Sequence, residues 1–292
     1  MALDSYLARS ETLIEALPFI QKYRGQLFVI KYGGSAMEDE HTVERLLRDI
    51  VFLEAVGINP VVIHGGGKAI SSRMREAGLK TRFVGGLRVT CAEAIRIVEE
   101  VLDSSINAHI VEKINSFGGR AASFPGKEIF TARKLAPRRD EKGEEVDLGF
   151  VGEVTRVNTE ALGKFIAEET VPVISPLGRD EAGTILNINA DIAAGAVAAA
   201  LGAAKMIYLS DVLGIMRDPK EPDSLIPTLP VKGVHQLIDE GIIAGGMLPK
   251  VESAISAIRN GVGKVHFIDG RIPHSLLLEI FTNSGVGTEI VA

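Results

Sequence analysis

The sequence predicts an α/β protein: a three-layer αβα sandwich around a central, mainly parallel open sheet, with an added N-terminal helix. Short β-branched runs alternate with helical patterns along the 292 residues, an order typical of parallel strands covered by helices. The runs are continuously apolar, as strands buried on both faces require. They occupy residues 27–31, 60–64, 171–175, 206–210 and 265–268.

Between the first two strands, apolar residues spaced three and four apart from Val43 to Val51 predict a helix that ends at Gly57. Thr90 and Glu93 match a capping box, so we expect a long helix to start there and run towards Phe117. An Ala-rich stretch over residues 190–202 predicts a further helix.

The first 24 residues stand apart, because they carry an apolar stripe ahead of the first strand and Pro18 is expected to kink the helix. This stripe needs a partner, which is either the body of the same subunit or a second subunit that exchanges helices with it. The stripe consists of Leu7, Leu13, Ile14, Leu17 and Ile20.

Composition limits the class of protein. With 32 basic and 38 acidic residues the net charge is −6, which argues against a nucleic-acid partner. Cys91 is the single cysteine, so an internal disulfide is excluded and zinc-ligand spacing is missing. No apolar run has the length of a membrane span and no secretory leader is recognisable. We therefore expect a cytoplasmic protein without a membrane partner or bound metal site.

A charged segment, residues 138–145, is flanked by two strand-like stretches at 130–135 and 152–158. This pattern predicts the tip of a β-hairpin, a place where functional loops often lie. A surface loop without a role explains the same pattern equally well.

Glycine turns follow the first two strands. Lys31, Gly33 and Gly34 mark the first turn, and residues 64–68 (HGGGK) form the second. Ligands of open α/β sheets bind at the carboxyl ends of strands, and exposed N–H groups at a helix start attract anions. Since glycine lacks a Cβ atom, the backbone can approach an oxygen-rich ligand closely. Two such turns in successive units predict an anion site.

Three further groups accompany the turns. Arg88 precedes a helix and has the fork geometry that suits a carboxylate, although a surface ion pair explains it as well. Asn187, Asn189 and Asp191 come directly before the Ala-rich helix, and three polar residues exceed what one helix cap needs. Lys250 lies in the first turns of another helix, where a cation opposes the helix dipole, so a bound anion that neutralises it is expected there.

These segments together resemble the N-acetylglutamate kinase branch of the amino acid kinase family. The resemblance extends from about residue 12 to the end of the chain. One departure is Ser35, where the family usually has asparagine. In chain order the matching motifs are IKYGGSAM, VIHGGGKAI, GLRVT, DLGFVGEV, NINADIAAGAVAAALGA, LSDVLGI and GGMLPKV.

The resemblance implies the amino acid kinase fold and transfer of the ATP γ-phosphoryl group to the side-chain carboxylate of N-acetyl-L-glutamate, the second step of arginine biosynthesis. It implies ATP as co-substrate and Mg²⁺ held mainly by phosphates. It also implies an N-terminal oligomerisation helix (1–26), an N-acetylglutamate-binding lobe (27–189) and an ATP-binding lobe (190–292). By motif, the catalytic residues are Lys31, Lys250 and Asp191; the substrate-binding residues are Gly66, Gly67, Arg88, Asn187 and Asn189; the nucleotide-binding residues are Gly33, Gly34, Ser210, Asp211, Gly246 and Met247.

The N-terminal extension resembles that of the arginine-inhibited family members, in which this helix links dimers into a hexamer, a trimer of dimers. The C-terminal segment resembles their arginine site. The implied arginine-site residues are Lys205, His266, Glu279 and Gly285.

Two alternative functions stay open at this point. One is a related kinase that acts on carrier-linked aminoadipate, whose reacting carboxylate would make similar contacts. The other is a non-catalytic arginine sensor with the same fold, against which the intact Lys31, Lys250 and Asp191 argue.

Overall fold

The computed structural model describes residues 2–37, 39–218 and 220–292. Within them an eight-stranded sheet has the order β14-β16-β15-β13-β1-β2-β10-β5, and its neighbours are parallel except for the antiparallel pair β15–β16. All five predicted strands are confirmed. The strands are β1 (Leu27–Tyr32), β2 (Asn59–His64), β5 (Ala121–Phe124), β10 (Val171–Ile174), β13 (Lys205–Ser210), β14 (Thr228–Pro230), β15 (Lys264–Asp269) and β16 (Thr288–Val291).

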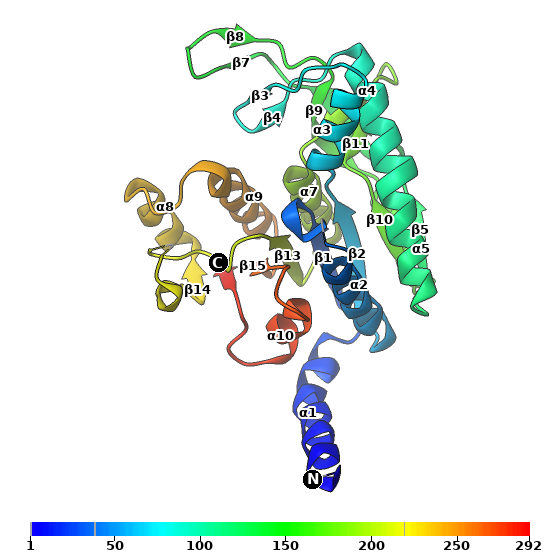
Figure 1. Cartoon of the computed structure of the whole chain (residues 1–292), viewed down its shortest axis with the longest axis vertical. Helices are drawn as coiled ribbons and strands as arrows, with labels where there is room; N and C mark the ends of the chain where they lie inside the picture. The colour runs from blue at the N-terminus through cyan, green and yellow to red at the C-terminus, as the bar shows by residue number, and fades with distance from the viewer. Residues whose placement is uncertain (1, 38, 219) are drawn as a thin grey trace.

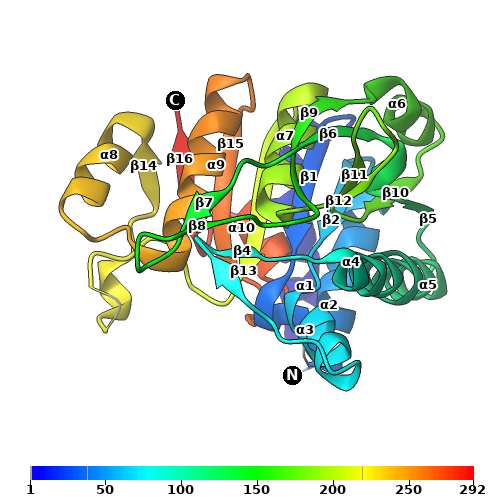
Figure 2. The same ribbon diagram turned by 90° about the horizontal axis from the view of Figure 1, so that it is seen from above.

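Helices cover both faces of this sheet, which confirms the three-layer sandwich (Figure 2). One face packs on α6 (Thr159–Ala167), α7 (Ala190–Leu201), α8 (Val231–Asp239) and α9 (Leu248–Arg259). The opposite face packs on α2 (Glu40–Ala55), α5 (Ala108–Ser116), α10 (Ser275–Phe281) and the end of α1 (Ala2–Tyr23). Because the central strands are buried on both sides, their continuous apolar runs follow from burial. Gly57, at φ +84°, ends α2 as predicted.

Helix α1 projects from one end of the molecule (Figure 1). Its last turns pack against the body through Phe19, Ile20 and Tyr23, whereas Leu13 and Ile14 are each 67% exposed. The helix continues through Pro18. None of the described helices combines the length and apolar character that crossing a bilayer demands.

The long helix predicted from Thr90 to Phe117 forms as α4 (Ala92–Glu99), the π-helical segment η2 (Glu100–Asn107) and α5. The predicted capping box is wrong, because Cys91 is the N-cap residue and it makes no side-chain cap bond. Thr90 is instead fully buried, and its hydroxyl donates to the Arg88 carbonyl at 2.9 Å. The backbone of Thr90 pairs with Gly149, which explains the burial.

The charged segment 138–145 lies at the tip of a hairpin, as predicted. β6 (Phe130–Lys134) pairs antiparallel with β9 (Val151–Val157), and the tip adds β7 (Arg138–Arg139) and β8 (Glu145–Val146). β11 (Leu177–Arg179) and β12 (Ile185–Ile188) complete a small sheet with β6 and β9. A second hairpin, β3 (Phe83–Val84) with β4 (Leu87–Arg88), lies at the same end of the molecule, opposite α1 (Figure 1).

The remaining helices are short or border the glycine turns. α3 (Gly67–Glu76) follows β2 directly and packs with α4 and η2 in a separate apolar cluster. The 3-10 turns are η1 (Gly34–Met37), η3 (Gly126–Glu128), η4 (Pro222–Ser224) and η5 (Gly245–Met247).

Candidate active site

Two lysines from distant parts of the sequence meet at one carboxylate. Lys31 Nζ lies 2.9 Å from Asp191 Oδ1, and Lys250 Nζ donates to Asp191 Oδ2 at 2.8 Å. Lys31 is near the end of β1, Asp191 is in the first turn of α7, and Lys250 is in the first turn of α9. The structure therefore brings together the three residues that the sequence singled out as catalytic.

The helix starts explain this geometry. Asn189 caps α7 by accepting hydrogen bonds from the N–H groups of Asp191 and Ile192, which fixes the first turn and the direction of the Asp191 side chain. Lys250 opposes the dipole at the start of α9. Asp191 neutralises it from within the chain, so this lysine does not by itself require the bound anion expected from the sequence.

Burial and neighbouring charges have opposite effects on the pKa values of Asp191 and Lys31. Burial alone would raise the pKa of Asp191, but the ammonium groups of Lys31 and Lys250 outweigh it and hold the pKa below its ordinary value. Burial lowers the pKa of Lys31, and the negative charge of Asp191 opposes that effect. The carboxylate therefore stays ionised and favours the charged form of the buried Lys31 ammonium group.

Two residues that bind the backbone carbonyl of Asp191 were not predicted from the sequence. Ser253 donates its hydroxyl to the Asp191 carbonyl at 3.0 Å, and the buried Tyr208 hydroxyl reaches the same oxygen at 3.5 Å. Ser253 lies three residues after Lys250 on α9, and this spacing places both on one helix face. That spacing is the signal that would have found Ser253.

The two glycine turns lie against each other beside the lysine. A Cβ atom at Gly33 would lie 2.9 Å from Lys31 Nζ and 3.6 Å from the Gly65 Cα. At Gly66 a Cβ atom would lie within 2.8 Å of methyl groups of Leu102 and Ile106. A Cβ atom at position 33 or 66 would therefore displace these side-chain ends, and glycine at both positions lets the side chains pack close to the backbone.

A cavity of about 200 Å³ lies beside Lys31, Asp191 and the second glycine turn, and Lys250 is not among its lining residues. Arg88 is buried against its wall, where Nη2 donates to the Gly67 carbonyl at 2.7 Å and to Ser71 Oγ at 2.9 Å. Burial lowers the pKa of Arg88. The lining residues that the sequence analysis had selected are Lys31, Gly66, Gly67, Arg88, Asn187, Asn189 and Asp191.

Hydrogen bonds and close backbone contacts join three of the sequence motifs, GLRVT, DLGFVGEV and NINAD, around Asn187. Its side-chain amide donates to Thr90 Oγ1 at 3.4 Å, and its backbone N–H donates to the Phe150 carbonyl at 2.9 Å. Gly149 contacts Thr90 so closely that a Cβ atom there would lie 2.2 Å from the Thr90 carbonyl oxygen. The GLRVT, DLGFVGEV and NINAD motifs thus form one wall, although 97 residues separate Thr90 from Asn187.

The residues expected to bind nucleotide do not line this cavity. Ser210 ends β13 and is buried, and its hydroxyl has no hydrogen-bond partner among the described residues. The Asp211 carbonyl accepts from Arg271 at 2.8 Å. Gly246 and Met247 form the 3-10 turn before α9, and Gly34 starts η1, while the Ser35 side chain lies outside the described part of the structure.

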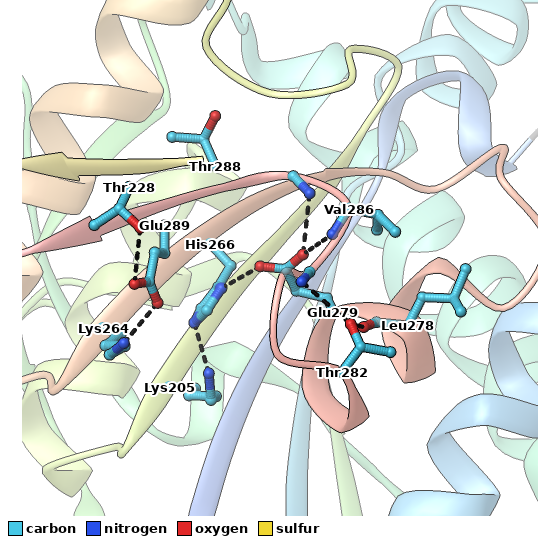
Figure 3. A network of polar contacts seen from close by, with 12 residues as sticks. Lys205, Thr228, Lys264, His266, Leu278, Glu279, Thr282, Val286, Thr288 and Glu289 are labelled. Carbon is cyan, nitrogen blue, oxygen red and sulfur yellow. Dashed lines mark hydrogen bonds and ion pairs between the residues drawn. The ribbon is translucent and has the colours of Figure 1, made fainter. Parts of the chain in front are cut away.

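The residues expected to bind arginine form one buried chain of polar contacts (Figure 3). Lys205 Nζ lies 2.9 Å from His266 Nε2, and His266 Nδ1 lies 2.6 Å from Glu279 Oε1. Glu279 Oε2 accepts from the N–H groups of Val286 and Gly287 at 2.7 and 3.0 Å. A Cβ atom at Gly285 would lie 2.6 Å from that oxygen.

The three side chains of this cluster influence one another. Burial lowers the pKa of Lys205 to about 8. Burial also lowers the pKa of His266, while Glu279 opposes the shift. Burial would raise the pKa of Glu279, but His266 and the two N–H groups hold it below its ordinary value. Both oxygens of Glu279 are therefore engaged within the cluster.

Comparison with known proteins assigns the family. The family model described as "Amino acid kinase family" matches residues 26–269, and the chain belongs to this family. It is 49% identical to the acetylglutamate kinase of Akkermansia muciniphila over 295 aligned positions, which cover 99% of each chain.

The fold is also similar to that of a solved enzyme, N-acetylglutamate synthase from Neisseria gonorrhoeae. The complex of that synthase with coenzyme A and N-acetyl-glutamate has a TM-score of 0.84 and 27% identity, over 97% of this chain and 63% of the synthase chain. Its complex with coenzyme A and L-arginine has a TM-score of 0.81 and 25% identity, over 97% and 65%. The chain thus spans somewhat less than two thirds of the synthase.

Proposed function

We propose that this chain transfers the γ-phosphoryl group of ATP to the side-chain carboxylate of N-acetyl-L-glutamate and so forms N-acetyl-L-glutamyl 5-phosphate, a step of arginine biosynthesis. The observation that carries the proposal is the meeting of Lys31 and Lys250 at Asp191 beside the two glycine turns. The relationship to acetylglutamate kinases at 49% identity supports the choice of acceptor. A cytoplasmic location, where ATP is available, is part of the proposal.

The chemistry suits this arrangement. A carboxylate with an ordinary pKa of about 4.3 is already ionised at neutral pH, so the nucleophile needs no general base. The barrier lies in bringing an anion up to a polyanionic phosphate, which requires positive charge and in-line positioning. Lys31 and Lys250 supply the charge. Asp191 is unsuited to act as a base, because each of its oxygens faces an ammonium group.

The remaining residues divide between the two substrates. The glycine N–H groups of the second turn and the side chains of Arg88 and Asn187 are suited to bind the acyl amino acid, since they line the cavity on the side of residues 27–189. Asn189 acts there as the cap that orients Asp191. ATP would lie over residues 190–292, near Ser210, Asp211, Gly246 and Met247, with its phosphates at Gly33 and Gly34.

Magnesium would enter with the nucleotide. Asp191 lines the cavity, but both of its oxygens are paired with lysines, so it offers no free oxygen to a cation. We infer that phosphates and water hold the ion, as is common for Mg²⁺ at phosphoryl-transfer sites. When bound, the ion neutralises phosphate charge.

Trapping of the acyl phosphate tests the proposal. The chain, ATP and Mg²⁺ are incubated with hydroxylamine and either N-acetylglutamate, glutamate, aspartate or N-acetylaminoadipate, and the hydroxamate is measured. We expect N-acetylglutamate to give the largest kcat/KM. Equal or better turnover of another acceptor would reassign the substrate, and no hydroxamate with any acceptor would refute the kinase assignment.

We also propose that arginine inhibits the enzyme at the Lys205–His266–Glu279 cluster, with Glu279 accepting the guanidinium. The L-arginine complex of the related synthase supports this assignment. Because both Glu279 oxygens are engaged, arginine would have to displace the bond from His266 or those from Val286 and Gly287. Glu279→Gln should lose inhibition by arginine, which titration of the rate with arginine measures; unchanged inhibition would move the site elsewhere.

The exposed part of α1 supports a proposed hexamer built from three dimers. Tyr6, Leu7, Leu13 and Ile14 are all more than half exposed, and an apolar helix face of this kind is stable in water when a second copy covers it. Deletion of residues 1–24 should give active dimers with weaker arginine inhibition. Sedimentation measures the assembly, and a persistent hexamer would contradict helix exchange.

A further inference from the structure

His64 is the last residue of β2 and its side chain is fully buried. Its Nδ1 atom lies 3.0 Å from the carbonyl oxygen of Gly65, the first glycine of the second turn. Its Nε2 atom lies 3.2 Å from the side-chain nitrogen of Asn107, which also donates to the Val173 carbonyl at 2.8 Å. The imidazole thus joins the glycine turn to a neighbouring helix and strand.

These contacts fix which ring nitrogen carries the proton. The Asn107 nitrogen is a donor, so Nε2 must accept, and the proton of the neutral ring is on Nδ1. Burial lowers the pKa of His64 to about 4, which keeps the ring neutral at physiological pH. The Nδ1–H group therefore donates to the Gly65 carbonyl.

The direction of that carbonyl decides the direction of the next N–H group. A trans peptide is planar, so the carbonyl of Gly65 and the N–H of Gly66 point in opposite directions. Gly66 precedes α3, where the first N–H groups have no partner within the helix, and it lines the cavity beside Lys31. Holding the Gly65 carbonyl at His64 thus holds the Gly66 N–H on the far side of the same plane.

We propose that His64 is a positioning residue, itself held by Asn107, which directs the Gly66 amide at an anionic oxygen of the reacting groups in the cavity. The identity of that oxygen rests on the proposed kinase function. The resemblance to the family implies that the glycines contact substrate, and His64, which precedes them, would set the direction of that contact.

The π-helical segment supports the same role. Leu102 and Ile106, both within η2, bring methyl groups so close to Gly66 that a Cβ atom there would have to displace them. Asn107 is the last residue of the same segment. Single π-turns inside α-helices often occur at functional sites. The π-helical segment η2 therefore packs against the second glycine turn. It also orients the His64 imidazole, which fixes the Gly65 carbonyl.

Two amide substitutions separate positioning from packing. In His64→Asn the amide nitrogen takes the place of Nδ1 and can still donate to the Gly65 carbonyl. In His64→Gln the amide takes the place of Nε2, fills more of the ring volume and keeps the contact with Asn107, but it lacks the Nδ1 donor. A packing role predicts that Gln is the better replacement, and a positioning role predicts that Asn is.

Melting temperature, steady-state kinetics with N-acetylglutamate and crystal structures of both variants provide the test. We expect His64→Gln to lower kcat/KM by about tenfold or more, because a misdirected donor near the reacting atoms loses much of its effect, and His64→Asn to lower it by less than threefold while melting no higher than the Gln variant. The 65–66 peptide should keep its plane in the Asn variant and rotate in the Gln variant.

Activity that follows melting temperature, with the Gln variant the more active one, would overturn the inference. So would an unrotated 65–66 peptide in the Gln variant. If the wild-type chain gives no hydroxamate with N-acetylglutamate, the proposed function fails, and the peptide planes of the two variants still decide the role of His64.

Discussion

Replacing Asp191 by asparagine tests the central assembly, because it removes one charge and keeps the shape of the side chain. At 2.9 Å and an effective dielectric constant of about 20, Asp191 attracts each ammonium group by about 6 kcal/mol before the cost of burial is counted. Without that attraction Lys31 and Lys250 repel each other in a buried site. We expect kcat to fall by about 10² to 10³, the loss typical of a misplaced charge-stabilising group.

The pH dependence gives a second readout. Burial lowers the pKa of Lys31, and Asp191 opposes that shift. Asparagine has no charge to oppose it, so Lys31 should lose its proton at lower pH in the variant. The alkaline decline of kcat should therefore begin at lower pH than in the wild type, as measured by hydroxamate formation at saturating substrates.

Asp49→Asn is the matched control. Asp49 is also buried and lies 2.6 Å from His274 Nδ1, but it is on α2, on the opposite face of the sheet. This variant should change stability while kcat stays near the wild-type value. An Asp191→Asn enzyme with kcat within threefold of wild type and an unmoved alkaline limb would refute the proposed role of Asp191.

Three further predictions follow from single contacts. Arg88→Ala should raise the KM for N-acetylglutamate more than it lowers kcat, because Arg88 lines the cavity that is proposed to bind the acyl amino acid; steady-state kinetics would reassign the residue if kcat fell more. Gly195→Ala should lower kcat by about tenfold, since its Cβ atom would lie 2.7 Å from Ser253 Oγ and displace the hydroxyl that holds the Asp191 carbonyl; an unchanged kcat would contradict this. Burial raises the pKa of Asp49 to about 6, so the native state keeps a proton that the unfolded chain releases. The free energy of unfolding should therefore fall by up to about 3 kcal/mol as pH rises from about 4 to 6. Denaturation at several pH values measures it, and an equal pH dependence in the wild type and in Asp49→Asn would disprove the prediction.

The strands and the glycine turns were predictable because a pattern within a short stretch of sequence determines each of them. A run such as LFVIK is apolar at every position, and burial on both faces is the physical reason for that pattern. The meeting of Lys31, Asp191 and Lys250 was also anticipated, but through the resemblance to the amino acid kinase family; its physical reason is that parallel strands and the helices after them bring their ends to one edge of the sheet.

Contacts that depend on register between distant segments were not predictable from one sequence. Thr90 looked like a helix cap, but Gly149 pairs with it and buries it. Asn107 carries no local sign that its amide faces His64, because the π-helical turn shifts the face on which it lies. In both cases a long-range contact overrides the local pattern, as tertiary packing often does.

The Asp191 ion pairs also explain how ammonium groups are held in a buried site before substrate binds. Lys31 comes from β1, whereas Asp191 and Lys250 come from the helices of the C-terminal half. An isolated buried ammonium group would tend to lose its proton; the pairing with Asp191 opposes that loss and fixes the position of the ammonium group before a substrate arrives. Under the proposed function, a phosphoryl group would share these ammonium groups with the carboxylate. Since the charges are already oriented, little reorganisation is left for the reaction itself, and this is where preorganised electrostatic catalysis gains its rate.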